Sequence, residues 1–535
     1  MKLRNATRSR EQGPVAQELF ARAIEKQQAG LLDSAAALYQ QILTAQPDAI
    51  AALFNLGVVR QGLGDLPGAA ACFERALALR PELAEAHNSL GLTLRRQQKL
   101  TQARAHYERA LALKPDYADA WSNLGVLLRL MDELDASEQC LAKALALRPE
   151  NAGILDNLGN TLRDQGRLEE SAALHQQAIA AQPKFAHAHN NLGYTLRKLG
   201  RLREARASFL QAQALDARSP DIRWNLCLLD LLEGNFVAGW RGYEVRQERN
   251  ESRPRQFAQP QWRGERLDGA RILLHAEQGL GDSLQFLRYV PLVIAAGGRV
   301  ILNVPATLRR LAAELPGVET VTVDDEPLPA FTWHCPLMSL PLAFRTEPDS
   351  IPGHVPYLKT PDEALEAADR LTWAAGDVRV GLVWSGNPKC AEDRMRSLRL
   401  ADFEPLLAVN GVRFYSLQVG AAAGQLGSMP TGVTDLRSAI HDFADTAALV
   451  EHMDLVIAVD TSVAHLAGAL ARPTWLLLPF APDWRWLLRR EDSPWYPTMR
   501  LFRQPRFGDW AAVVERVRDE LAAWQQRRRT DSSLP

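Results

Sequence analysis

The sequence predicts two kinds of fold in one chain: an all-α superhelix of paired helices, then an α/β region of two doubly wound parallel-sheet lobes. Two observations lead to this prediction. The dipeptide Leu-Gly recurs every 34 residues through the first half, which indicates a stack of similar helix pairs. After residue 268 this period ends, and short apolar runs alternate with helical stretches, which indicates buried parallel strands joined by helices.

Length and composition set the outer limits. A chain of 535 residues is too long for one core, so two or three folded units are expected. The net charge of −1 argues against a whole-protein attraction to nucleic acid or anionic membrane. No apolar run is long enough for a transmembrane segment, and the basic start lacks the apolar stretch of a secretory signal. Five scattered cysteines without a C-x-x-C pair indicate a reducing compartment, so a cytoplasmic location is expected.

The repeat unit has the features of two packed helices. Glycine and alanine let the helices approach, a bulky residue fills the seam between them, and proline follows the second helix. The recurring glycines are Gly57, Gly91, Gly125, Gly159 and Gly193, the seam residues are Phe73, Tyr107, Leu141, His175 and Phe209, and the prolines are Pro81, Pro115, Pro149 and Pro183. The pattern resembles the tetratricopeptide repeat over residues 16–219. A degenerate unit, with Cys227 in the glycine slot, extends the predicted array to 247.

Such arrays bind peptides on their concave face, and one slot of the first helix carries amide side chains. Asparagine offers a donor and an acceptor together, so a ladder of asparagines suits the backbone of an extended peptide. The alternative is that asparagine is simply common in this slot of the family. Arrays of this kind sometimes dimerise, so a homodimer is also open. The slot contains Asn55, Ser89, Asn123, Asn157, Asn191 and Asn225.

The second half is divided by its composition. Residues 1–15 and 528–535 are expected to be tails, 248–268 a charged linker or strap, 269–362 the first lobe, 363–377 an interlobe segment, and 378–527 the second lobe. Strands are predicted at 272–276, 300–304, 320–323, 378–384, 412–417, 455–459 and 474–478. Helices are predicted at 284–296, 308–315, near 403–409, at 463–471 and at 510–524, the last bracing the two lobes.

Two turns after predicted strands carry the chemistry, because ligands of open parallel sheets lie beyond the carboxyl ends of the strands. The first contains Gly279, Gly281 and Asp282 and opens a helix. Its glycines permit close approach of a ligand, although Asp282 can equally be a helix-capping residue. The second turn, 460–469, offers two hydroxyls, backbone N–H groups and a helix dipole to a phosphate. His465 in that helix can face the anion or simply pack.

Together the two turns resemble those of the bacterial heptosyltransferases, glycosyltransferases of the GT-B fold, over residues 270–525. The resemblance implies that Asp282 is a catalytic base and that the 460–469 turn binds the donor diphosphate. The joining of repeats to such a domain is similar to the layout of protein O-GlcNAc transferases, in architecture only. Serine 462 replaces the family's glycine, and arginine its usual lysine. The donor-binding residues implied or expected are Gly279, Gly281, Asn387, Lys389, Arg396, Gln418, Asp460, Thr461, Ser462 and His465, with Arg394 as a rival to Arg396.

The expected function is inverting, metal-independent sugar transfer from a nucleotide-diphosphate sugar to a hydroxyl of a protein held by the array. No cofactor beyond the donor substrate and no nucleic acid partner are expected. The nucleotide base is expected near 418–420 or 442–446, and the aromatic run 479–486 is expected to pack between lobes or to line a sugar pocket. Two rival interpretations remain: a non-catalytic scaffold, for which the serine at 462 is a reason, and a nucleotide-sugar sensor without turnover.

Overall fold

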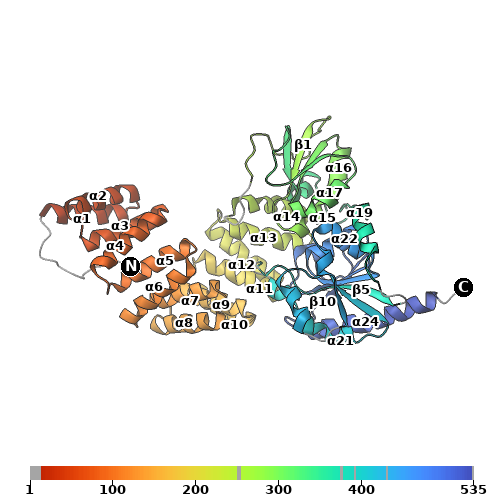
Figure 1. Ribbon diagram of the computed structural model, residues 1–535. Helices are drawn as coiled ribbons and strands as arrows, with labels where there is room; N and C mark the ends of the chain where they lie inside the picture. The colour runs from red at the N-terminus through yellow and green to blue at the C-terminus, as the bar shows by residue number, and fades with distance from the viewer. Residues whose placement is uncertain are drawn as a thin grey trace. The chain divides into compact units, whose positions relative to one another are not determined.

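The computed structural model describes residues 14–249, 255–373, 377–388, 390, 393–428 and 432–532 (Figure 1). The predicted donor ligand Lys389 and most of the N-terminal tail lie outside the described residues. The chain divides into two compact units, residues 1–195 and 196–535, and each unit is considered by itself.

The first unit is built from antiparallel helix pairs, which confirms the predicted all-α repeat array (Figure 1). Its helices are α1 Pro14–Gln28, α2 Leu32–Ala45, α3 Ile50–Leu63, α4 Leu66–Leu79, α5 Ala84–Arg96, α6 Leu100–Leu113, α7 Ala118–Leu130, α8 Leu134–Leu147, α9 Ala152–Asp164 and α10 Leu168–Ala181, and α11 Ala186–Lys198 begins in it. Each recurring proline stands two residues beyond the end of a second helix, as Pro81 does after α4, where it cannot continue the helix.

The glycine slot explains how closely each pair packs. A Cβ placed on Gly57 would lie 2.6 Å from a ring carbon of Phe73, and one on Gly91 would lie 2.8 Å from Tyr107. Such distances are too short for a real side chain, so the seam residue occupies the volume that glycine leaves empty. The predicted fit of a small residue against a bulky one is therefore confirmed.

The turn between the two helices of each pair contains one residue with positive φ, again every 34 residues. Five of these positions hold glycine, which adopts this conformation without steric cost. The other two hold residues with a side chain, for which the same conformation is strained. The positions are Gly30, Gly64, Gln98, Asp132, Gly166, Gly200 and Gly234.

The second unit begins with the last helices of the array, so the compact units do not divide at the predicted array boundary of 247. These elements are α12 Leu202–Leu215, α13 Pro220–Leu232, α14 Phe236–Tyr243 and the 3₁₀ turn η1 Glu244–Glu248. The reason is aromatic packing. Trp240 is 2% exposed, its Nε1 donates to the carbonyl of Thr346 (3.0 Å), and its ring meets Phe286 and Trp495 edge to face. The final repeat is thus part of the core that the α/β region also uses.

Two parallel sheets follow, as predicted. The first has the order β3-β2-β1-β4 and the second the order β10-β9-β8-β5-β6-β7, and all neighbouring strands of the two sheets pair in parallel. The strands are β1 Arg271–His275, β2 Arg299–Asn303, β3 Val318–Thr322, β4 Trp333–Pro336, β5 Val378–Val383, β6 Val412–Ser416, β7 Val433–Asp435, β8 Leu455–Val459, β9 Thr474–Leu478 and β10 Met499–Arg503.

Seven strands were predicted within a few residues, and three were missed. Strand β4 has four residues and ends in proline, β7 has three residues, and β10 carries arginine at two of its five positions. Segments this short or this polar do not show the continuous run of branched apolar residues by which a buried strand is predicted.

Short helices and 3₁₀ turns join the strands. They are α15 Leu280–Phe286, η2 Leu287–Tyr289, α16 Val290–Ala295, η3 Ala306–Leu308, α17 Arg309–Ala313, η4 Leu337–Ser339, α18 Leu340–Ala343, α19 Asp362–Asp369, α20 Asp393–Arg396, η5 Leu400–Phe403, α21 Glu404–Leu407, η6 Ala421–Ser428, η7 Arg437–Ala439, α22 Phe443–Glu451, α23 Ser462–Ala469, η8 Trp484–Trp486 and α24 Trp510–Ser532. The apolar residues of α24 join the core cluster on one face of the second sheet, which differs from the predicted bracing of both lobes.

The segment before the first sheet packs against it and is a strap rather than a free linker. Gln261 forms a parallel bridge with His334 of β4, and the N–H of Trp262 donates to the carbonyl of His334 (2.7 Å). Trp262 is 1% exposed and belongs to the core, so residues 260–262 extend the edge of the first sheet.

Candidate functional site

The predicted turns lie at the switch points of the two sheets. Strand β1 has β2 on one side and β4 on the other, and the chain reverses its direction of winding between β1 and β4. The second sheet reverses in the same way between β5 and β8. Open α/β sheets bind ligands beyond the carboxyl ends of the strands at such points. The turns after β1, β5 and β8 are therefore the places where a ligand site is expected.

Two contacts bring the first-sheet turn against the second-sheet turn. A Cβ on Gly281 would lie 2.9 Å from Cδ2 of His465 and 3.5 Å from Cα of Ser462. Helix α15 packs on α23 along the same line. Only glycine fits at position 281, so the sequence permits the start of α15 to touch the start of α23.

Both carboxylate oxygens of Asp282 are engaged. Oδ2 accepts a hydrogen bond from the N–H of Gly279 (2.9 Å), as expected of an acidic residue in the first turn of a helix. Oδ1 pairs with Nη2 of Arg485, which follows strand β9 of the second sheet. The side chain of Asp282 is 21% exposed. The capping role weighed from the sequence is therefore present, together with an ion pair that the sequence did not predict.

Arg485 is buried and bonds to side chains of both lobes. Its Nε donates to Oε1 of Gln285 in α15 (2.5 Å), and its Nη1 donates to Oδ1 of Asp483 (2.8 Å). The guanidinium carbon lies 4.3 Å from the ring centroid of Trp484. Burial disfavours the charge, but Asp483 and Asp282 raise the pKa of Arg485 overall, so this arginine stays charged.

The turn after β8 contains an unsatisfied hydroxyl. Thr461 is the residue before α23 and is 9% exposed, and its Oγ1 is buried without a hydrogen-bond partner among the residues that the structure describes. Next to it, Oδ2 of Asp460 accepts from the indole Nε1 of Trp486 (2.9 Å). A buried hydroxyl without a partner costs free energy unless a ligand or water satisfies it. Thr461 is thus the residue of this turn that most directly indicates a ligand.

Asp460 has an unusual ionisation. Burial and the neighbouring Asp483 raise its pKa from 3.8 to about 6, and Arg396 and the Trp486 hydrogen bond oppose that rise only in part. The carboxyl is 8% exposed. Its charge is therefore lost within a mildly acidic range that ordinary aspartates do not sense.

His465 packs and does not offer a cation to the site. Its Nδ1 lies 2.9 Å from the hydroxyl of Tyr496, and its ring stacks on Trp486 with centroids 5.4 Å apart. Burial, followed by Arg485 and other nearby arginines, lowers its pKa well below 6.5. The neutral ring fills the seam where Gly281 approaches. Packing, weighed from the sequence as the alternative, is what the geometry supports.

The loop after β5 presents Arg396 to this turn. Arg396 Nε donates to Oδ1 of Asp393 (3.2 Å), and Ser397 Oγ donates to Oδ2 of the same carboxylate (2.9 Å). The N–H of Gly386 donates to Ser397 Oγ (2.9 Å), so the loop is tied to helix α20. Burial opposes its charge, but Asp460 and other acceptors raise the pKa of Arg396. Asn387 and the rival Arg394 are exposed on the same loop and helix.

Gln418 holds this loop in place, and this differs from the predicted role. Its Oε1 accepts from the N–H groups of Trp384 and Ser385 (3.0 and 2.9 Å), and its Nε2 donates to the carbonyls of Ser385 and Val419 (3.0 Å each). The side-chain amide has used both hydrogens and both acceptor positions. Hydrogen-bond recognition of a nucleotide base by this side chain would therefore require it to release the loop, and a base near 418–420 stays a prediction.

Two surface hollows lie elsewhere. One, of about 350 Å³, is lined by Leu232, Glu233, Leu487, Leu488, Arg490 and Asp492, and the other, of about 480 Å³, runs along α24. Among the described residues, no group of three or more histidine, cysteine, aspartate or glutamate side chains is arranged to hold a metal ion. Across the same residues, every helix is too short or too polar to span a bilayer.

The asparagine slot of the array forms bonds between neighbouring repeats. Nδ2 of Asn123 donates to Oδ1 of Asn88 (2.9 Å), and Nδ2 of Asn191 donates to both oxygens of Asp156 (3.0 and 2.9 Å). Asn157 makes the equivalent, longer contact with the hydroxyl of Ser122 (3.4 Å). Asn55 is half-buried, and Asn225 is 8% exposed. The asparagines of the predicted ladder therefore donate hydrogen bonds to neighbouring repeats. Where an amide makes only one such bond, its second hydrogen can still bind a peptide.

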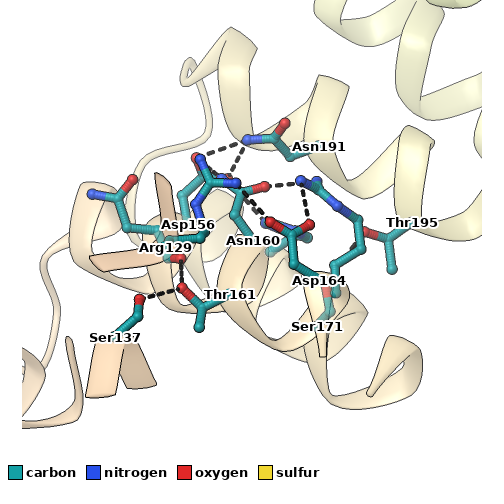
Figure 2. A network of polar contacts seen from close by, with 12 residues as sticks. Arg129, Ser137, Asp156, Asn160, Thr161, Asp164, Ser171, Asn191 and Thr195 are labelled. Atoms are coloured by element: carbon teal, nitrogen blue, oxygen red, sulfur yellow. Dashed lines mark hydrogen bonds and ion pairs between the residues drawn. The ribbon is translucent and has the colours of Figure 1, made fainter. Parts of the chain in front are cut away.

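Asp156 is the centre of the polar network in Figure 2. Asp156 is 5% exposed, and its carboxylate also lies 2.9 Å from Nδ1 of His175, which replaces the bulky apolar seam residue of other repeats. Along the same helix, Asp164 accepts from Arg129 (2.7 Å) and from Arg163 (3.4 Å) (Figure 2). Three consecutive helices, α9 to α11, are thus joined by side-chain bonds as well as by apolar packing.

Comparisons with known proteins support the array directly. Models described as "TPR repeat" and "Tetratricopeptide repeat" match residues 62–98, 91–132, 116–184 and 157–220, so the chain contains tetratricopeptide repeats. Protein FlbA of Caulobacter vibrioides (strain ATCC 19089 / CIP 103742 / CB 15) is 29% identical in an alignment 320 residues long that covers 54% of this chain and 52% of FlbA. The chain therefore spans about half the length of this curated relative.

Several solved structures resemble part of this chain, and some of them are described as tetratricopeptide repeat proteins. PilW, described as a widely conserved type IV pilus biogenesis factor, is 22% identical, with a TM-score of 0.37, 40% of this chain covered and 100% of PilW. A tetratricopeptide repeat protein from Parabacteroides merdae ATCC 43184 is 16% identical, with a TM-score of 0.40 and coverage of 44% and 94%. YrrB, described as a TPR protein with an unusual peptide-binding site, is 18% identical, with a TM-score of 0.28 and coverage of 34% and 95%.

Sequence reasoning missed the partners that surround the predicted residues. Arg485, Gln285, Asp483 and Asp393 all contact the site, and none of them was predicted as a site residue. The one available signal was an arginine between two tryptophans, Trp484 and Trp486, soon after a predicted strand. Both tryptophans are buried, in keeping with the interlobe packing that was one of the two interpretations of this run.

Proposed function

We propose that the second half of the chain transfers a sugar from a nucleotide-diphosphate sugar to a hydroxyl group, and that the repeat array holds the protein that carries it. The observation that carries this proposal is the buried, unpartnered hydroxyl of Thr461 at the switch point of the second sheet. Asp460 stands in the same turn as Thr461, and Arg396 lies close enough to Asp460 to affect the ionisation of that carboxyl. A helix start, a hydroxyl and a guanidinium together suit a diphosphate.

The proposed reaction is a single inverting displacement. Asp282 takes the proton of the acceptor hydroxyl while that oxygen forms a bond to the anomeric carbon. The bond from that carbon to the donor phosphate breaks, and its electron pair leaves with the diphosphate. Arg396 and the start of α23 stabilise the charge that develops there, and general-base help of this kind is worth about 10²–10⁴ in rate. The carboxylate uses one acceptor position on each oxygen in its present contacts, and in the proposed reaction the pair with Arg485 opens so that the acceptor hydroxyl can approach Oδ1.

The array would raise the local concentration of the acceptor. Tetratricopeptide repeats are established in this chain, and the half-buried amides of Asn123 and Asn157 each make one inter-repeat bond, which leaves a second N–H for a peptide. An extended backbone matches such regularly spaced donors without a demand on its side chains. A protein that is tethered by the array would encounter the transferase at a higher effective concentration than a free protein would.

One observation favours a second candidate, a nucleotide-sugar sensor without turnover. Both oxygens of Asp282 are already bonded, one to Gly279 and one to Arg485, as in a structural capping residue. Such a protein would still bind a nucleotide through Arg396 and Thr461. The two candidates therefore differ in what Asp282 does, and agree on the ligand.

The first experiment measures thermal unfolding with UDP, GDP, ADP, CDP and dTDP. A ligand at 100 times its dissociation constant adds about 2.7 kcal/mol to the unit that binds it, or several degrees. Arg396→Ala is expected to lose the shift. The matched control is Arg399→Ala, which removes a guanidinium that is 78% exposed a few residues along the chain and pairs with Asp402. If none of the five shifts the wild type, nucleotide binding is ruled out and only the repeat scaffold remains.

The second experiment separates transferase from sensor. The nucleotide sugar of the base that binds is supplied with a protein extract as the source of acceptors, and the release of free nucleoside diphosphate is measured. Asp282→Asn is expected to abolish release while nucleotide binding persists. Release that continues at the wild-type rate in Asp282→Asn would contradict the proposed base, and absence of release from the wild type would favour the sensor.

A further inference from the structure

Arg485 is the cation that the proposed mechanism leaves unused. It is 7% exposed, it carries three donor contacts, and one of these holds the oxygen of Asp282 that the reaction needs. Its position next to the donor turn is fixed from two sides. Trp486 bonds Asp460 directly, and Gly281 lies against Ser462, so the neighbours of both Arg485 and Asp282 touch the start of α23.

The charges around this turn do not yet suit an anion. Three carboxylates, Asp282, Asp460 and Asp483, interact with two guanidiniums, Arg396 and Arg485. Arg485 is paired with two of the three carboxylates in this state. A bound diphosphate adds at least two negative charges, and those must be met by a cation that is free to turn toward them.

We propose that Arg485 binds the donor diphosphate and, in doing so, exchanges partners: it pairs with Asp282 when the site is empty and releases Asp282 when a diphosphate is bound. This inference rests on the proposed function. Nη2 moves from the carboxylate to a phosphate oxygen, whereas Nε and Nη1 keep their bonds to Gln285 and Asp483. The 21% exposure of Asp282 leaves the solvent side of the pair open to an incoming anion.

The exchange gives a binding order. The base is held by Arg485 until the donor arrives, so the acceptor proton can be removed only when the leaving group is already in place. Asp282 also competes with the donor for one guanidinium. Removal of its charge therefore strengthens donor binding, and this gain depends on Arg485, whereas a gain from the mere removal of a nearby negative charge would not.

The test is a double-mutant cycle on ligand affinity, measured by calorimetric titration of the full chain. The probes are inorganic pyrophosphate and whichever nucleoside diphosphate shifts the wild type. Asp282→Asn is the informative variant, because Gly279 and Arg485 contact different oxygens of the carboxylate. The amide oxygen of asparagine can keep the bond from the Gly279 N–H, and the NH₂ group that then faces Arg485 cannot accept a hydrogen bond. The pair partner is changed to Arg485→Lys, which keeps the charge and loses the fork, and to Arg485→Gln. Arg490→Gln is the matched control, since it ends an exposed pair with Asp492 on the same segment.

Asp282→Asn is expected to bind both probes about tenfold more tightly, the size of one charged hydrogen bond, and to have no such effect when Arg485 is also changed. Arg485→Lys and Arg485→Gln are expected to weaken binding, and Arg490→Gln is not. Unchanged or weaker binding in Asp282→Asn would overturn the exchange. Binding that depends on Arg396 but not on Arg485 would overturn it and leave the proposed function intact. If no probe binds the wild type, both fall together.

Discussion

At the residue scale, the site is defined by what each polar side chain has already bonded. Thr461 has no partner, Gln418 has no capacity left, and Asp282 has a partner that must leave. These three states cannot be read from residue type, since threonine, glutamine and aspartate are all plausible ligands of a sugar nucleotide. The difference lies in neighbours that the fold brings from elsewhere in the chain.

Asp460 gives a pH-dependent prediction. Its pKa is raised to about 6 in the folded protein, so between pH 4 and 6 the unfolded carboxyl is ionised and the folded one is protonated. Unfolding then releases a proton, and the free energy of unfolding falls as the pH rises. Asp460→Asn keeps an acceptor for Trp486 and removes this term. We expect the stability of the variant relative to the wild type to increase from pH 4 to pH 6.5, by up to about 3 kcal/mol.

Differential scanning calorimetry of the two proteins across this range measures the change. Asp492→Asn is the control, because Arg490 lowers the pKa of that exposed carboxyl and the trend should be small and of opposite sign. A stability difference that stays constant with pH would show that Asp460 does not ionise as described.

The residues that follow strands could be predicted from the sequence, and their partners could not. Asp282, Arg396 and Thr461 stand in turns after β1, β5 and β8, and the pattern of a branched run followed by small and polar residues marks such turns. Arg485 lies about 200 residues along the chain from Asp282. A single sequence holds no signal for a pairing of that separation, so the most informative contact of the site emerged only from the fold.

At the element scale, the 34-residue period dictates the array down to its turns. The positive-φ residue of each turn was not predicted, although glycine at several of the positions is visible in the sequence. Gln98 and Asp132 adopt the same conformation with a side chain attached, which shows that packing of the pair sets the turn and the residue tolerates it. The same logic explains the missed strands β4, β7 and β10, which neighbouring strands hold in place despite their weak local signal.

Gln98→Gly tests whether that turn is strained. Gln98 has φ 62° and an exposed side chain, so glycine relieves the conformation without loss of packing. We expect roughly 0.5–1 kcal/mol of local stabilisation, measured by hydrogen exchange of the α5–α6 pair, since repeat arrays open locally. The control is Gln102→Gly, an exposed position inside α6, where glycine should destabilise the same pair by about 1 kcal/mol. Faster exchange in both variants would contradict the strain.

At the scale of the whole molecule, the boundary between units falls inside the repeat array. Helices α12 to α14 continue the repeat pattern, yet Trp240 and Tyr243 belong to the core that contains the sheets. The composition change near residue 248 marks where the repeats end, not where the compact unit begins. A periodic sequence predicts where its repeats lie, but it does not predict which core each repeat packs into. The reason is that the same helix pair can stack on another repeat or on a sheet.

The division predicts that core substitutions act on separate unfolding transitions. Trp240→Ala removes a ring that is 2% exposed and packed against Phe286 and Trp495, so it should destabilise residues 196–535 by about 3–5 kcal/mol. Tyr107→Ala removes a fully buried ring of the first unit and should act on residues 14–195. Calorimetry of each variant, with hydrogen exchange to assign the transitions, measures this. If Trp240→Ala instead loosened α1 to α10 and left the sheets unchanged, the last repeat would belong to the array after all, and the route by which a held protein reaches the candidate site would have to be reconsidered.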